Sequence, residues 1–139
     1  GVNWNARPFG TNGITGGVYR LNDLRRQISR TDLIHARSDI PAVSALVSKE
    51  APVLWDVRSL WADQKVLIQD NFINSRLYHS YRKLESIASR QSLGMSTLTS
   101  AVVPILLDRN KKLPALRAVV PTAVDLGRFQ LNPKIIYDS

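Results

Sequence analysis

Hydrophobic residues recur at helical spacing from Leu54 to Leu93, a stretch that contains neither proline nor glycine. An unbroken helix of this length would extend roughly 60 Å. Two apolar stripes share the stretch and lie almost opposite one another around the helix axis. The first comprises Leu54, Val57, Trp61, Ile68 and Phe72, and the second comprises Ile73, Leu77, Tyr81, Leu84 and Ala88. We expect the helix to continue and to pack against different neighbours along its length; a break within Asp70–Ser75, which would give a helical hairpin, is the alternative.

Shorter helices are predicted before this stretch. Val18–Arg30 has polar residues near its start and arginines near its end, where cations suit the helix dipole. Pro41–Lys49 is preceded by Asp39, which can cap it, and proline is well tolerated in a first turn. The sequence therefore predicts a mainly α fold, with a long central helix or helical hairpin, shorter flanking helices, and extended N- and C-terminal arms.

A short similarity follows the central stretch. Residues 101–108 (AVVPILLD) and 118–125 (AVVPTAVD) are identical at five of eight positions. Each copy predicts an extended segment, a bend at the proline and a short helical turn. Two alternatives remain: the prolines kink apolar helices, or the similarity is a coincidence among common residues.

Composition divides the chain into three segments. Residues 1–17 hold five of the seven glycines, and a segment of this kind buries too little apolar surface to fold alone. We therefore expect an extended arm at 1–17 that neighbouring subunits order, with Trp4, Arg7 and Phe9 as its contacts. Residues 18–127 form a single helical domain, and 128–139 form an extended tail.

Charge narrows the range of partners. The chain has 19 Lys and Arg against 11 Asp and Glu, a formal net charge of +8, and both ends are more basic than the middle. Such a balance favours an acidic partner. The absence of cysteine excludes disulfides, thiolate metal sites and cysteine nucleophiles. We find neither a signal peptide nor an apolar run long enough to cross a membrane, and we expect no membrane contact.

Basic residues in three places are candidate contacts to nucleic acid or to an acidic partner. They are the row Arg76, Lys83 and Arg90 with His79 beside it, the predicted tip Arg109, Lys111 and Lys112, and the pair Arg25 and Arg26. The row repeats every seven residues and could follow phosphates without reading sequence. An ordinary solvated helix face is the alternative.

The chain shows no constellation typical of catalysis. Asp32, His35 and Asp39 have helical spacing but an unfavourable context for a metal, and Asp63 and Asp70 are better explained by solvation than by acid–base chemistry. No phosphate-binding glycine loop or nucleophile motif occurs. We therefore predict a protein that is not an enzyme, with no catalytic residue, metal site or cofactor.

These observations favour a structural subunit of a large assembly, in particular a virion or phage minor structural protein. Its partners would be other protein subunits, a homo-oligomer among the alternatives, and non-specific nucleic acid. We expect it in a virion or intracellular particle. A self-standing basic helical protein that binds nucleic acid is the second hypothesis; it explains the charge but not the arms.

Overall fold

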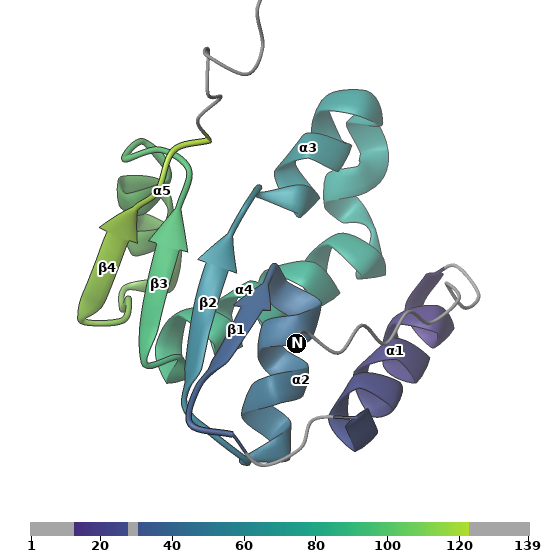
Figure 1. Ribbon diagram of the computed structural model, residues 1–139. Helices are drawn as coiled ribbons and strands as arrows, with labels where there is room; N and C mark the ends of the chain where they lie inside the picture. The colour runs from purple at the N-terminus through teal and green to yellow at the C-terminus, as the bar shows by residue number, and fades with distance from the viewer. Residues whose placement is uncertain (1–12, 28–30, 123–139) are drawn as a thin grey trace, which may run out of the picture.

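The computed structural model describes residues 13–27 and 31–122. Helices and strands alternate along most of this part of the chain (Figure 1). The elements are α1 (Gly13–Gln27), β1 (Ile34–Arg37), α2 (Asp39–Ser48), β2 (Val53–Val57), α3 (Trp61–Ile68), the 3-10 helix η1 (Asp70–Asn74), α4 (Arg76–Gln91), β3 (Gly94–Thr97), α5 (Val102–Asn110) and β4 (Leu116–Val119).

The four strands form one parallel sheet in the order β1-β2-β3-β4. Each strand returns to the next through a helical connection, and such connections are almost always right-handed. The helices α2, α4 and α5 therefore lie on the same face of the sheet, and α1 packs against the outer side of α2 (Figure 1). All four strands end at the same edge, which we call the carboxyl edge.

The expectation of a mainly α fold is wrong, because the sheet makes this an α/β protein. The predicted central helix contains most of β2, and its favoured continuity fails. In β2 every second residue, Val53, Trp55 and Val57, faces the helices, and Asp56 on the other face is also buried. Because the strand is buried on both faces, it lacks a clear alternation of apolar and polar residues. Its apolar residues match helical spacing by chance.

The alternative break at Asp70–Ser75 is confirmed, although the result is not a simple hairpin. Residues Asp70–Asn74 form η1, and Ser75 caps α4 by accepting a hydrogen bond from the backbone N–H of Tyr78 (3.1 Å).

Gly94, which follows the end of the predicted stretch, lies inside β3. A Cβ there would lie 3.1 Å from Leu54 Cδ1 and 3.2 Å from Leu116 Cβ, so the glycine allows two neighbouring strands to carry leucines.

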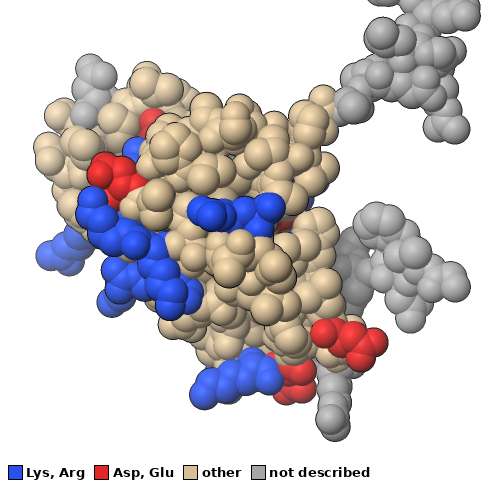
Figure 2. Space-filling model, turned by 90° about the vertical axis from the view of Figure 1, so that its left-hand side faces the viewer, with Lys and Arg blue, Asp and Glu red and all other residues tan. Residues whose placement is uncertain are grey.

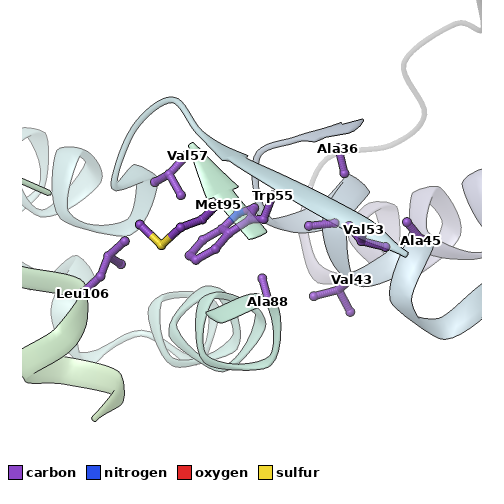
Figure 3. Packing of buried hydrophobic residues seen from close by; sticks show 10 residues of the cluster. Ala36, Val43, Ala45, Val53, Trp55, Val57, Ala88, Met95 and Leu106 are labelled. Carbon is purple, nitrogen blue, oxygen red and sulfur yellow. The ribbon is translucent and has the colours of Figure 1, made fainter. Parts of the chain in front are cut away.

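The hydrophobic core lies between the sheet and the helices α2, α4 and α5 (Figure 3). The indole of Trp55 is fully buried at its centre, beside Met95 of β3 and Ala88 of α4. Leu106 of α5 closes one end and Val43 of α2 the other. The helices bring small residues to the sheet, so they approach it closely.

Of the two helices predicted before the central stretch, one is confirmed and the other has a different start. The helix predicted over Pro41–Lys49 is confirmed as α2, and Lys49 follows its end with φ 59°. The prediction that Asp39 caps this helix is wrong, because Asp39 is the first helical residue. The helix predicted from Val18 starts earlier, at Gly13, so residues 13–17, assigned to the arm, form the first turn of α1.

Residues 1–12 and the tail at 128–139 lie outside the described residues. The repeat is not structural, because its first copy forms α5 whereas the second begins within β4.

Candidate functional site at the carboxyl edge of the sheet

Polar residues follow three neighbouring strands at the carboxyl edge. Arg37 and Ser38 end β1, Arg58 and Ser59 follow β2, and Thr99 and Ser100 follow β3. In open parallel sheets, ligands bind outside the carboxyl ends of the strands, where loops and helix starts converge. The edge is therefore the part of this fold in which a binding site is expected.

A buried carboxylate organises the edge. The side chain of Asp56, at the end of β2, is only 6% exposed. Its Oδ1 accepts a hydrogen bond from Ser96 Oγ of β3 (2.9 Å), and its Oδ2 accepts one from Arg58 Nε (2.6 Å). His35 Nε2 of β1 lies 3.7 Å from the same Oδ2. Three strands therefore contribute to one polar cluster, on the sheet face opposite to α2, α4 and α5.

The strand register places these residues together. Arg37, Asp56 and Ser96 are direct partners across β1, β2 and β3 and so point to the same face. The His35 side chain is 59% exposed and the Arg58 side chain 36% exposed. The carboxylate is thus enclosed while two of its partners extend into solvent, where a ligand can contact them.

Ser38 joins β1 to α2 in an unusual backbone conformation. Its φ of 72° and ψ of 177° fall in a region that is otherwise almost restricted to glycine. The conformation is held by its N–H, which donates to the backbone carbonyl of Asp56 (2.9 Å). The other described residues with positive φ, Lys49 and Lys111, follow helix ends in the ordinary left-handed conformation. Strain of this kind concentrates at functional sites.

The electrostatics of the edge favour an anion. The N-terminus of α2 begins immediately after Ser38 and that of α5 follows the loop after β3, so the positive ends of two helix dipoles lie at the carboxyl end of the sheet, which also carries Arg58. Asp39, in the first turn of α2, accepts a hydrogen bond from Trp55 Nε1 (3.2 Å). Burial, and to a lesser degree the Glu85 carboxylate, raises the pKa of Asp39 to about 7. Near neutral pH this carboxyl is therefore partly uncharged.

A second ionic cluster lies among the helices. Glu85 of α4 is 4% exposed, pairs with Arg82 one turn away, and accepts a hydrogen bond from Asn110 Nδ2 of α5 (3.0 Å). Arg109 Nη1 lies 3.9 Å from Glu85 and donates at 2.6 Å to Asp63 of α3. Its Nη2 donates to the other oxygen of Asp63 (2.9 Å). The cluster ties α3, α4 and α5 together.

The residues predicted as basic contacts lie on α4, on α1, and at or just after the end of α5. Arg76, His79, Lys83 and Arg90 are exposed along α4, and Arg25 and Arg26 are exposed in the last turn of α1. At the predicted tip, Lys111 Nζ pairs with Asp108 (3.1 Å) and Lys112 is exposed. Figure 2 shows basic side chains gathered on the side of the molecule that carries α5 and β4. The arm residues Trp4, Arg7 and Phe9 lie outside the described residues.

Arg109 differs from the other members of the predicted tip. Its guanidinium makes a bidentate pair with Asp63, and the hydrogen bonds to that carboxylate raise the pKa of Arg109. This side chain links α5 to α3 rather than projecting toward a partner. Asp63, considered with Asp70 as a solvated pair, is therefore a structural residue.

The sequence did not indicate Arg37, Ser38, Asp56 or Arg58 as site residues. The available signal was an apolar segment, VLWDV, followed at once by arginine and serine. This pattern is typical of a buried parallel strand that ends at a polar edge, but it is informative only after the segment has been recognised as a strand. Residues Asp32, His35 and Asp39 do not form a metal site, and no candidate metal cluster occurs in residues 13–27 and 31–122.

No protein family, curated protein or solved structure matches this chain. The parallel sheet and the polar carboxyl edge are therefore the basis for the functional argument. None of the described helices has the length and apolar character needed to span a bilayer.

Proposed function

We propose that this protein binds an anionic small molecule, one that carries a phosphate or carboxylate group, at the carboxyl edge of its sheet. The observation that supports the proposal is the Asp56–Arg58 pair. A buried carboxylate holds an arginine at the end of a central strand, beside the start of α2. Ligands of α/β sheets bind at this edge.

The geometry of Arg58 supports an anion in particular. Arg58 contacts Asp56 through Nε at 2.6 Å, so the far edge of the guanidinium, which carries one N–H of each terminal amino group, points away from that bond. Two oxygens of a phosphate or a carboxylate can accept both of these N–H groups at once. Because Asp56 also accepts from Ser96, its orientation is fixed by β3, and the arginine is held in place before the ligand arrives.

Two neighbouring features supply further contacts. Arg37 is exposed one residue before Ser38 and extends to the same sheet face as Asp56. The first backbone N–H groups of α2, which follows Ser38, have no side-chain cap and could donate to an anion. A ligand with one anionic group could therefore be contacted by two arginines and a helix N-terminus.

A titration with inorganic phosphate, followed through backbone amide NMR signals, tests the proposal. We expect signals of residues 37–39 and 58–59 to shift with saturation, and the Arg58→Gln variant to lose the shifts. Arg117→Gln is the matched control, because Arg117 is exposed on β4, away from Asp56 in the register. Shifts that fail to saturate, or that are equal in both variants, would contradict the proposal.

Binding of nucleic acid is a second candidate, which the exposed row Arg76, Lys83 and Arg90 on α4 favours. Replacing all three with Gln should abolish most retention of the protein on single-stranded DNA at low salt. Unchanged retention would remove this candidate. Because the row lies outside the carboxyl edge, the triple variant should still respond to phosphate.

The hypothesis of a structural assembly subunit, in a virion or another particle, depends on the arms predicted from the sequence, and residues 1–12 and 128–139 of these lie outside the described residues. Within the described part, the edge strand β4 favours it. All four residues of β4 are exposed, and Leu116 and Val119 are apolar. An unprotected apolar edge is a surface that another subunit could extend. That the protein is not an enzyme stays a prediction from the sequence.

A further inference from the structure

The segment between β2 and α4 carries the most exposed large apolar residues of the described chain. Leu67 is 86% exposed and Ile68 is 75% exposed at the end of α3, and Ile73 of η1 is 45% exposed. Figure 1 shows that α3 rises beyond the carboxyl end of β2. We call Leu67, Ile68 and Ile73 the apolar tip. Two adjacent aliphatic side chains so fully in water are a costly arrangement unless something covers them.

The tip is fixed to the fold by aromatic contacts. The Trp61 ring stacks on Tyr81 with centroids 4.1 Å apart, and Phe72 contacts Trp61 edge-on at 5.9 Å. Phe72 also meets the Tyr78 ring edge-on at 6.2 Å. These rings point back toward α4, so the base of the segment has its own small core while the tip faces outward. The exposure is thus a consequence of the packing.

The sequence beside the apolar tip carries two cationic residues, Lys65 and Arg76, and one acidic residue, Asp70, which lies between Ile68 and Ile73. The Nζ of Lys65 lies 5.6 Å from the centroid of the Trp61 ring, and Arg76 is exposed at the start of α4. The carboxylate of Asp63 on the same segment is neutralised by Arg109. The chain as a whole has a net charge of +8. A surface that is anionic outside and apolar inside is complementary to exposed apolar residues that lie beside cationic ones.

We infer that the apolar tip docks on an anionic lipid bilayer, with Leu67 and Ile68 entering the acyl boundary and Lys65 and Arg76 meeting the headgroups. The charge complementarity selects this occupant over a second copy of the chain, because two copies with the same strong positive charge repel each other. This contact is peripheral and requires no spanning helix. The inference is separate from the proposed anion site.

The sequence predicts no membrane contact, because it contains no apolar run long enough to cross a bilayer. The apolar tip was instead hidden inside the predicted central helix, where Ile68 was assigned to a packed stripe. Only the fold shows that no described neighbour covers it.

Flotation with lipid vesicles tests the inference. The full chain should bind vesicles that contain phosphatidylglycerol and phosphatidylcholine, and bind weakly to phosphatidylcholine alone. Leu67→Gln with Ile68→Gln should reduce binding to the mixed vesicles at least about tenfold. The matched control is Leu116→Gln with Val119→Gln, which removes the exposed apolar residues of β4 and should leave binding unchanged. Equal loss in both double variants would contradict the inference.

A site-specific probe distinguishes insertion from general attraction. Because the chain lacks cysteine, Leu67→Cys can carry a single polarity-sensitive dye, with Val47→Cys, at an exposed position of α2, as its control. A blue shift at 67 and none at 47 on mixed vesicles is expected. Absence of a shift at 67, or self-association that disappears in the Gln double variant, would overturn the inference; the second result would identify a copy of the chain as the occupant.

Discussion

Asp56 and Glu85 are both 4% exposed and both pair with arginine, but they belong to regions with opposite roles. The partners of Asp56 are the more exposed: the side chains of His35 and Arg58 are 59% and 36% exposed. The partners of Glu85 are less exposed, with 20% for the side chain of Arg82 and 25% for that of Arg109. Burial of a carboxylate alone therefore does not identify a functional site.

The exposure of the partners is the informative difference. Around Glu85, each polar group comes from a helix and satisfies another, so the cluster fixes how α3, α4 and α5 pack. Around Asp56, the carboxylate is enclosed and the cationic groups lie at the carboxyl edge, where a ligand can complete their hydrogen bonds. The first region should respond to mutation mainly in stability and the second mainly in binding.

The largest expected effect is on stability in the Glu85 cluster. Glu85→Ala should lower the free energy of unfolding by about 3–5 kcal/mol, because it leaves Arg82 and Asn110 enclosed without their acceptor. Urea denaturation measures the change. Asp108→Ala, which breaks an exposed pair with Lys111, is the control and should cost less than about 1 kcal/mol. Equal costs would show that the cluster does not hold the helices.

The same substitution at Asp56 should have a smaller effect on folding. Asp56→Ala should cost about 1–3 kcal/mol, because Arg58 can turn to water while Ser96 loses its acceptor. Binding of inorganic phosphate should nevertheless be lost, as measured by amide NMR. If Asp56→Ala destabilised the protein as much as Glu85→Ala and left phosphate binding intact, the assigned roles would have to be exchanged.

The raised pKa of Asp39 predicts that the free energy of unfolding depends on pH. Its folded-state pKa of about 7 lies above the ordinary value of 3.8, so the folded protein holds an additional proton between these pH values. The stability conferred by this proton is complete below about pH 4 and is lost as the pH rises through 7. Asp39→Asn keeps the acceptor for Trp55 Nε1 and should remove this decline, by a few kcal/mol at most.

The difference between wild type and Asp39→Asn, followed by urea denaturation from pH 4 to pH 8, isolates the contribution of this one group. A constant difference across the range would mean that the folded-state pKa of Asp39 is not raised. The groups that act on Asp39 are the Trp55 indole, the Glu85 carboxylate and the Arg82 guanidinium, and none of them changes in the variant.

The smallest effect concerns backbone strain at the carboxyl edge. Ser38→Gly should raise the free energy of unfolding by about 0.5–1 kcal/mol, because relief of the strain exceeds the added entropy of the unfolded chain. Phosphate binding should weaken at the same time, since the turn is no longer restricted to one conformation. Ser59→Gly is the control without a positive φ and should destabilise the protein. Destabilisation by both would show that Ser38 is not strained.

The sequence predicted several local elements correctly. Pro41 marked the start of α2 within two residues, and the self-bonding residues at 70–75 marked the true break before α4. The second apolar stripe, with Leu77, Leu84 and Ala88, describes the buried side of α4, so the exposed row at Arg76, Lys83 and Arg90 was placed correctly on a helix surface. These features depend on neighbours a few residues apart.

The sheet and the site could not be predicted in the same way. Parallel strands are short and buried on both faces, so Val53–Val57 lacks the alternation that distinguishes a strand from a helix. The contacts of Asp56 with Ser96 and of Asp63 with Arg109 join residues 40 and 46 positions apart. No local pattern records such pairs, because each partner is compatible with solvent when considered alone.

The sequence by itself determined the strong positive charge, the absence of thiol chemistry, the place of α2 and the break before α4, because these properties are local or additive. Tertiary structure decided the rest. Stacking four strands in parallel register gathered Arg37, Asp56 and Ser96 at one edge, and packing α3 on aromatic rings left Leu67 and Ile68 in water. Both outcomes depend on which distant residues become neighbours, and only the complete fold fixes that.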